Sequence, residues 1–199
     1  MIADEIAVMA ARLVVEDGME YGQAKRKAAR QLTRRLRPGV ELPNNERIEE
    51  EVCAYLELFC AQTQPAELYE LRRVAASWMH RLAEFRPHLG GAVWRGTATR
   101  NSSIHIDLYC DDSKSAEIAL INQGIAYEVE GSDRNNEVDF LRLTEYNANL
   151  CDTVTIYLAV RDRDDQRGAL KPDAHGRSWR GDTTALLRLL QMHPTVTTT

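Results

Sequence analysis

Roughly the first 90 residues carry apolar side chains at the three- and four-residue spacing of amphipathic helices. Gly18 ends the first such stretch, and a proline–glycine pair at 38–39 ends the second. An asparagine at 44 or 45 is placed to cap the third, and a proline at 65 suits the first turn of the fourth. The spacing therefore predicts four helices: one ending before Gly18, one over about 23–37, one after Asn44 or Asn45, and one from Pro65 to just before Pro87.

The pattern then changes to short apolar runs and alternating positions. Apolar residues at 104, 106, 108 and 110 alternate with His105, Asp107 and Tyr109, which predicts a strand with one buried face. The same criteria predict strands over 92–94, 125–129, 138–143 and 153–160, a short helix between Ser113 and Gly124, and a last helix over about 182–192. Residues 161–180 are charged and aperiodic, so we expect either a mobile loop or a binding loop there.

This order of elements favours an α+β fold. Sequential strands tend to pair, so the predicted strands would form a mixed β-sheet with helices packed on one side. The expected organisation is an N-terminal helical region over 1–64, an α+β core over 65–192 and a flexible tail over 193–199.

Composition narrows the class of protein. The chain has 199 residues and is 44% hydrophobic, which excludes a disordered chain, and its 11 glycines and 6 prolines exclude a collagen-like one. Lys and Arg total 25 against 30 Asp and Glu, a net charge of −5, so a generally basic nucleic-acid-binding surface is excluded. A basic stretch within the predicted helix at 25–37 could contact nucleic acid, but the acidic total favours a solvated helix face.

The cysteines and the lengths of the apolar runs indicate the cellular compartment. The four cysteines are Cys53, Cys60, Cys110 and Cys151. None of them forms a C-x-x-C pair, and each lies in an apolar-patterned stretch, so we expect reduced core residues. Reduced cysteines are typical of a cytoplasmic protein, which we therefore expect. The N-terminus lacks the pattern of a secretory signal, and no apolar run is long enough to span a membrane, so we expect no membrane association. Nothing in the pattern indicates an oligomeric state.

The segment 90–108 carries the candidate chemistry. It combines a predicted strand, a loop of small polar residues and a second strand with a polar face. Gly96 would let the backbone approach a ligand, Thr97 adds a hydroxyl, and Arg100 adds a charge suited to phosphate. Ser103, His105 and Asp107 lie on one face of the second strand, so we expect them to face whatever the loop holds.

This arrangement resembles the nucleotidyltransferase superfamily, in particular its minimal bacterial members. The signature of that family is a Gly-Ser after the first strand, then a polar loop that ends in Ser-Asp-x-Asp-Leu on the next strand. Gly96 and Thr97 match the Gly-Ser position, and Ser102 begins the segment that stands in the place of Ser-Asp-x-Asp-Leu. The resemblance covers about residues 66–160 and implies a nucleotidyltransferase-like fold, nucleoside triphosphate binding and a divalent cation, Mg²⁺, held by the two aspartates.

The chain departs from the signature at both aspartates. Ser103 stands in the first position and His105 in the second. Shifting the register by two residues brings His105 and Asp107 into these positions, but this supplies only one carboxylate for a metal ion. The resemblance therefore implies a phosphate-binding role for Gly96, Thr97, Arg100, Ser102 and Ser103, and a catalytic or metal-binding role for His105 and Asp107.

The segment and its departures from the family signature leave three possible functions. The first is transfer of a nucleotidyl group from a nucleoside triphosphate with a divalent metal. The second is a catalytically degenerate module of the same fold that binds a nucleotide, an RNA or a protein partner. The third is an interaction protein that uses its N-terminal helices as the contact surface.

Overall fold

The computed structural model describes residues 2–33, 41–133, 138–168, 171–173 and 175–192. It divides into two compact units. The first contains Met1–Leu68 and Thr97–Ser102, and the second contains Tyr69–Gly96 and Ser103–Thr199. The expected tail at 193–199 and the expected end of the second helix at 34–37 lie outside the described residues.

The first unit is built on three helices, which the sequence predicts. They are α1 (Ile2–Asp17), α2 (Tyr21–Thr33) and α3 (Asn45–Phe59). Their shared core contains Ile6, Ala10, Val14, Ala24, Ala28, Ile48 and Val52. The two alanines of α2 have no long side chain to hold the helices apart, so α2 packs closely on α1. Asn44 caps α3, as expected, by accepting a hydrogen bond of 2.8 Å from the backbone N–H of Arg47.

The fourth helix, α4 (Gln64–Arg81), continues past the division between the units at Leu68. A 3₁₀ turn, η1 (Ala83–Phe85), follows it. The second unit then contains β1 (His88–Gly90), α5 (Gly91–Arg95), β2 (Ile104–Cys110), α6 (Lys114–Asn122), β3 (Glu128–Asp133), β4 (Val138–Asn147), β5 (Asp152–Asp162), η2 (Arg163–Gly168), β6 (Gly181–Asp182) and α7 (Thr183–Met192).

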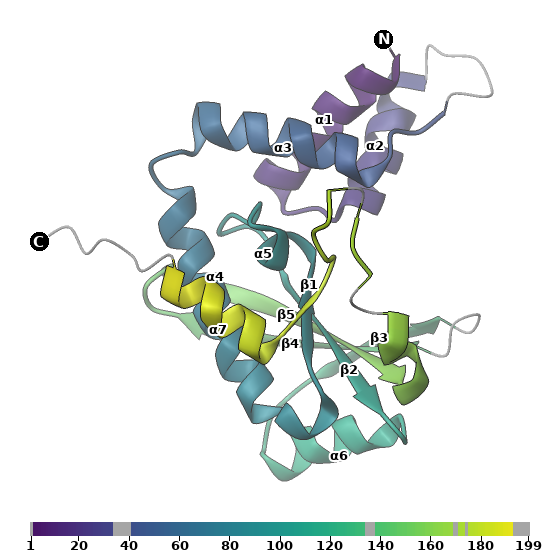
Figure 1. Ribbon diagram of the computed structural model, residues 1–199, viewed down its shortest axis with the longest axis vertical. Helices are drawn as coiled ribbons and strands as arrows, with labels where there is room; N and C mark the ends of the chain where they lie inside the picture. Colours follow the sequence, from purple (N-terminus) through teal and green to yellow (C-terminus); the bar gives the residue numbers. More distant parts are fainter. Residues whose placement is uncertain (1, 34–40, 134–137, 169–170, 174, 193–199) are drawn as a thin grey trace, which may run out of the picture. The chain divides into compact units, whose positions relative to one another are not determined.

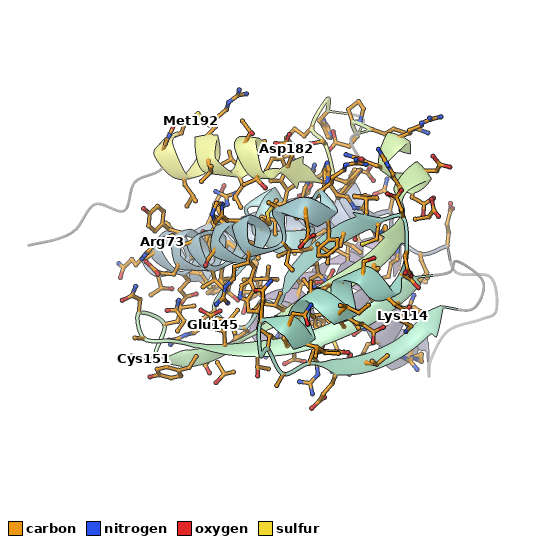
Figure 2. The ribbon with its side chains drawn as sticks, turned by 90° about the horizontal axis from the view of Figure 1, so that it is seen from below. Arg73, Lys114, Glu145, Cys151, Asp182 and Met192 are labelled. Carbon is orange, nitrogen blue, oxygen red and sulfur yellow. The ribbon has the colours of Figure 1, made fainter. Side chains whose placement is uncertain are left out.

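The strands of the second unit form one mixed sheet in the order β3-β4-β5-β2-β1-β6. Figure 1 labels β1 to β5 of this sheet. β2 and β5 run parallel, and the other neighbouring pairs are antiparallel. In Figure 2, α4 and α7 lie on the same side of β4 and β5. Trp78 of α4 donates a hydrogen bond of 2.7 Å to Glu145 of β4. The predicted α+β class with a mixed sheet is confirmed.

β2 is the central strand that positions the candidate site. Ile104, Ile106 and Leu108 are fully buried on one of its faces. On the other face, Asp107 and Tyr109 are also buried, so the expectation of a single buried face is wrong. Parallel pairing with β5 on one side and antiparallel pairing with β1 on the other leave β2 in the interior of the sheet.

The expected strand over 92–94 is wrong, because these residues form the middle of helix α5. Periodicity cannot separate strand from helix over so short a run. Two glycines in the left-handed region bound this helix: Gly91 has φ +65° and Gly96 has φ +89°. A strand of three residues, β1, directly precedes this helix.

Two smaller expectations also change. β3 begins at Glu128, so the strand expected over 125–129 is displaced toward the C-terminus. The expectation of four core cysteines is wrong, because only Cys110 is buried, whereas Cys53 and Cys151 are exposed. None of the four is in a disulfide bond. Among the described residues, none of the helices is long and apolar enough to cross a membrane.

Candidate functional site

A glycine pair at the end of β1 brings the backbone close to β2. Gly90 pairs with His105 across the antiparallel ladder, and Gly91 opens α5. A Cβ atom added to Gly91 would lie 3.5 Å from Cδ2 of His105, so the chain at Gly91 rests against the imidazole ring. Its positive φ is a conformation that residues with a Cβ rarely adopt. Strand β1, helix α5 and His105 therefore meet at Gly90 and Gly91.

Gly96 ends α5 as its C-cap. Its N–H donates a hydrogen bond of 2.9 Å to the carbonyl of Ala92. The buried guanidinium of Arg72 donates to the carbonyls of Val93 and Trp94, at 3.1 and 3.2 Å, and burial lowers the pKa of Arg72 from its ordinary value. These contacts explain Gly96 as a helix terminus.

Thr97 and Arg100 belong to the first unit and contact its residues. Thr97 is 2% exposed, and its hydroxyl shares a hydrogen bond of 3.0 Å with the hydroxyl of Tyr21. The backbone N–H of Arg100 donates to Glu67 at 3.0 Å, and the Arg100 side chain forms an ion pair of 3.8 Å with the same carboxylate. The Thr97 hydroxyl and the Arg100 charge therefore already have partners within this unit.

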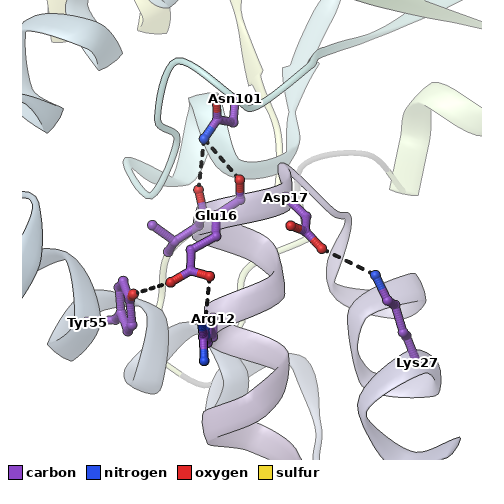
Figure 3. Close-up of polar contacts among 7 residues, drawn as sticks. Arg12, Glu16, Asp17, Lys27, Tyr55 and Asn101 are labelled. Atoms are coloured by element: carbon purple, nitrogen blue, oxygen red, sulfur yellow. Dashed lines mark hydrogen bonds and ion pairs between the residues drawn. The ribbon is translucent and has the colours of Figure 1, made fainter. Parts of the chain in front are cut away.

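The rest of this loop closes the end of α1. The Ser102 hydroxyl accepts a hydrogen bond of 3.0 Å from the N–H of Thr99, whose own hydroxyl donates to the carbonyl of Val15. Figure 3 shows the Asn101 amide donating to the last carbonyls of α1, those of Val15 and Glu16. These bonds satisfy carbonyl groups that a helix leaves without partners at its C-terminus.

His105 and Asp107 lie in the second unit on one face of β2, as the alternation predicts. His105 pairs in register with Tyr157 of β5, and their rings stack with centroids 5.1 Å apart and planes 16° from parallel. Ser103 precedes the strand and is half-buried. The stacked rings form an aromatic surface that spans the parallel pair of strands.

Asp107 is held between two arginines. Its Oδ1 lies 3.1 Å from Nε of Arg161, and its Oδ2 accepts a hydrogen bond from Nε of Arg180. The side chain of Asp107 is 10% exposed, while those of Arg161 and Arg180 are 22% and 33% exposed. Both carboxylate oxygens therefore have a cationic partner, and the group as a whole carries one net positive charge.

The sheet topology brings these three residues together. Asp107 pairs in register with Ala159 of β5, so Arg161 stands two residues further along the parallel neighbour on the same face. On the other side, β1 pairs with β6, and Arg180 directly precedes β6. Arg161 thus lies on β5, beside β2, and Arg180 lies just before β6, beside β1. Both arginines are far from Asp107 in sequence.

Two further side chains near Asp107 are structural. Burial, with the charge of Asp107 as a smaller cause, raises the pKa of Tyr109 to about 12, so this phenol stays protonated at neutral pH. The Tyr109 ring meets the ring of His88 edge-on, with centroids 5.2 Å apart. The Nδ1 of His88 forms a hydrogen bond of 2.9 Å with the carbonyl of Arg86.

A buried ion pair fixes the segment that carries Arg180. Nη2 of Arg95, in α5, lies 2.7 Å from Oδ2 of Asp173, and these side chains are 2% and 0% exposed. Burial opposes ionisation of Asp173, but backbone N–H donors and Arg95 outweigh it and lower its pKa to about 2. The Arg95 guanidinium also lies over the ring of Trp179, 4.2 Å from its centroid.

The residues predicted from the sequence divide between the units. Gly96, Ser103, His105 and Asp107 belong to the second unit, whereas Thr97, Arg100 and Ser102 belong to the first. Within the second unit the structure brings together His105 and Asp107 as neighbours on one strand face. Sequence reasoning missed four residues around them, namely Gly91, Tyr157, Arg161 and Arg180.

The donor atoms around Asp107 do not fit a magnesium ion. Magnesium prefers several oxygen ligands, but both oxygens of this carboxylate face guanidinium groups and the neighbouring position holds an imidazole. Among the described residues, no group of three or more His, Cys, Asp and Glu side chains could hold a metal ion.

Comparison with known proteins gives a partial likeness. No family model matches the chain, and no curated protein matches it. Among solved structures, it is similar to Cid1 poly(U) polymerase bound to MgATP, with 12% identity and a TM-score of 0.41 over 58% of this chain and 39% of that one. It is also similar to Cid1 in complex with a UTP analogue, with 15% identity and a TM-score of 0.40 over 58% of this chain and 37% of that one.

A third similar structure is that of a cytoplasmic RNA terminal U-transferase, with 15% identity and a TM-score of 0.39 over 59% of this chain and 39% of that one. This chain therefore spans about two fifths of the length of the chain in each of the three structures. With identities of 12–15% and TM-scores of 0.39–0.41, these likenesses do not identify what this chain binds.

Proposed function

We propose that this chain is a catalytically degenerate, nucleotidyltransferase-like module that binds a nucleotide phosphate directly on Arg161 and Arg180, without a metal ion. One observation carries the proposal: Asp107, the carboxylate to which the family resemblance assigns a metal-binding role, has each of its oxygens against a guanidinium group. A guanidinium can supply at this point the positive charge that a cation would otherwise bring.

The charge and exposure of the two arginines favour an anionic ligand. Two guanidinium groups against one carboxylate leave one net positive charge. Both contacts with Asp107 involve Nε, and each guanidinium carries further N–H donors in a planar fork that suits phosphate oxygens. Because Arg161 and Arg180 are partly exposed, a phosphate can reach them without unfolding the sheet.

The neighbouring rings suit the rest of a nucleotide. His105 and Tyr157 stack on the same face of the paired strands β2 and β5, two residues along β2 from Asp107. An aromatic surface beside a cationic group can stack a nucleobase while the arginines hold the phosphate. Gly91 contributes by letting the backbone close against His105.

The roles that the resemblance implies for the other predicted residues stay hypotheses. Phosphate binding by Gly96, Thr97, Arg100, Ser102 and Ser103, and metal binding by Asp107, are not needed for this proposal. The Thr97 and Ser102 hydroxyls already form hydrogen bonds within the first unit, which is why the proposal assigns the phosphate to the arginines.

Calorimetry with ATP, GTP, CTP and UTP tests the proposal, each in EDTA and in magnesium, with labelled triphosphate to detect any transferred nucleotidyl group. We expect at least one triphosphate to bind equally in both conditions and no labelled product. Binding that requires magnesium, together with labelled product, would instead establish the transferase. Absence of binding to all four triphosphates would refute nucleotide binding by this chain.

A matched pair of variants locates the site. Arg180→Ala should weaken binding by about 10-fold or more, since a charge-assisted hydrogen bond contributes roughly 1.5–3 kcal/mol. Arg163→Ala is the control, because Arg163 pairs with the exposed Asp111 beyond the end of β2, and it should change the affinity by less than about 2-fold. Equal effects of the two variants would refute a specific role for Arg180.

A further inference from the structure

Arg180 lies outside the regular structure that surrounds it. The strand β6 that follows it has only two residues, Gly181 and Asp182, which pair with β1. The Arg180 side chain nevertheless reaches past β1 to β2, where its Nε donates a hydrogen bond to Asp107. A long arginine side chain loses much conformational entropy when it is held in one position. The backbone on both sides of Arg180 therefore needs contacts beyond this short ladder.

Trp94, near the end of helix α5, contacts the chain just before Arg180. Its indole N–H donates a hydrogen bond of 2.9 Å to the carbonyl of Ser178, two residues before the arginine. Nη1 of Arg95 donates to the same carbonyl at 3.3 Å, and the Arg95 guanidinium lies over the ring of Trp179. Two neighbouring side chains of α5 therefore hold the carbonyl and the ring that precede Arg180.

The same indole ring packs on the chain just after Arg180. A Cβ atom added to Gly181 would overlap the six-membered ring of Trp94, so this ring lies directly on the backbone of the glycine. Gly181 is not among the glycines with positive φ, so its backbone conformation does not itself require glycine. The Trp94 ring explains why a residue without a side chain stands there. Trp94 therefore contacts the chain on both sides of Arg180.

Gly90 leaves open the path from Arg180 to Asp107. A Cβ atom added to Gly90 would lie 3.5 Å from Cγ of Arg180 and 3.7 Å from the carbonyl oxygen of Trp179. The stem of the arginine therefore rests on the bare backbone of β1 before its Nε reaches the carboxylate. Helix α5 thus fixes the backbone from which Arg180 starts, and β1 supports its stem.

We propose that Trp94 is a positioning residue for the phosphate site: it fixes Ser178 and Gly181, and so holds the guanidinium of Arg180 beside Asp107 before a ligand arrives. The inference rests on the proposed function, in which Arg180 binds the phosphate. An arginine that is already ordered loses less entropy when it binds an anion, which strengthens binding. Trp94 need not touch the ligand, because it acts through the position of Arg180 alone.

Trp94→Phe tests this role, with Trp78→Phe as the matched control. Both substitutions leave a smaller ring and remove an indole hydrogen bond within the second unit, because Trp78 donates to Glu145 at 2.7 Å. Urea denaturation measures the stability of each variant, and we expect both to fold and both to be less stable than the native chain. A difference in ligand binding between them would therefore not come from general destabilisation.

Two measurements follow Arg180 in these variants. In the free chain, NMR should show the Nε–Hε signal of Arg180 displaced in Trp94→Phe, because the bond to Asp107 loosens, and unchanged in Trp78→Phe. Calorimetry with ATP, GTP, CTP and UTP in EDTA measures the affinity for each triphosphate that the native chain binds. We expect Trp94→Phe to bind about 5-fold more weakly, a smaller loss than in Arg180→Ala, and Trp78→Phe to change by less than about 2-fold.

Gly181→Ala tests the contact from the other side and carries the test if Trp94→Phe does not fold. The added methyl group meets the Trp94 ring, so the Arg180 signal of the free chain should again be displaced. A phenyl ring is shorter and leaves room for this methyl group, so Gly181→Ala combined with Trp94→Phe should displace the signal less than Gly181→Ala alone. Effects that simply add would contradict the contact.

Three results would overturn the proposal: an Arg180 signal that stays in place in Trp94→Phe, an equal displacement in Trp78→Phe, or an unchanged affinity where the signal has moved. Failure of the proposed function is a separate result, namely that the native chain binds no triphosphate in EDTA. The Arg180 signal of the free chain reports the position of the side chain in either case.

Discussion

Asp107→Asn changes one charge at the centre of the candidate site and nearly nothing in shape. The substitution leaves Arg161 and Arg180 facing a neutral amide in place of a carboxylate. Removing one partner of a fully buried ion pair costs about 3–5 kcal/mol. Because the two arginines are 22% and 33% exposed and water can solvate them, we expect a loss of about 1–3 kcal/mol in the free energy of unfolding.

The same substitution should strengthen phosphate binding. A phosphate on the arginines would lie about 6 Å from the Asp107 carboxylate, and two unit charges at that separation repel by roughly 3 kcal/mol at an effective dielectric constant of ~20. Solvent screening at this partly exposed site reduces the repulsion to about 1 kcal/mol. We therefore expect Asp107→Asn to bind triphosphate about 5-fold more tightly than the native chain in EDTA.

Urea denaturation and calorimetry on the same protein separate the two effects. Asp111→Asn is the matched control, because Asp111 lies just beyond β2, is exposed and pairs with Arg163; it should change neither quantity measurably. If Asp107→Asn folds but loses triphosphate affinity, Asp107 contacts the ligand or its metal, and the reasoning from the two ion pairs is refuted.

Three more substitutions or titrations test the surrounding structure. The Asp173 carboxyl, followed by NMR of its side-chain carbon, should titrate near pH 2. The stability that its ionised form contributes is therefore present above about pH 4 and is lost as the pH falls through 2. A titration midpoint that stays near pH 2 in the Arg95→Ala variant would contradict the ion pair. Gly91→Ala should cost about 1–2 kcal/mol in urea denaturation, because φ is +65° while the 3.5 Å approach to His105 leaves room for a methyl group. Gly124→Ala, with φ +68° and nothing within 4 Å, should cost the same but leave nucleotide affinity unchanged, so an affinity loss shared by both would argue against a role for Gly91. Asn44→Ala should lose about 1 kcal/mol by the same measurement, and no loss would contradict the N-cap of α3.

Most of the fold follows from local patterns in the sequence. The helices α1 and α3 and the strands β2 and β5 are long enough for their periodicity to separate helix from strand. Helix α5 is too short for its periodicity to do this, and two glycines with positive φ determine where it begins and ends. Backbone conformation at a glycine leaves no periodic signal, which is why the sequence predicts a strand there.

The candidate site could be predicted only in part. The alternation along β2 places His105 and Asp107 on one face, and the structure agrees. The arginines could not be predicted, because Arg161 reaches Asp107 through the parallel pairing of β2 with β5, and Arg180 through the position of β6 beside β1. The one available signal was the charged, aperiodic segment over 161–180, for which a binding loop is one of the two expectations.

NMR of the arginine side chains tests the central claim most directly. In a spectrum that resolves the Nε–Hε groups, titration with ATP in EDTA should shift the signals of Arg161 and Arg180 together and to saturation, while the signal of Arg163 stays in place. Signals of Arg161 and Arg180 that remain unchanged in EDTA, or that move only when magnesium is added, would contradict direct binding of phosphate by the two guanidinium groups.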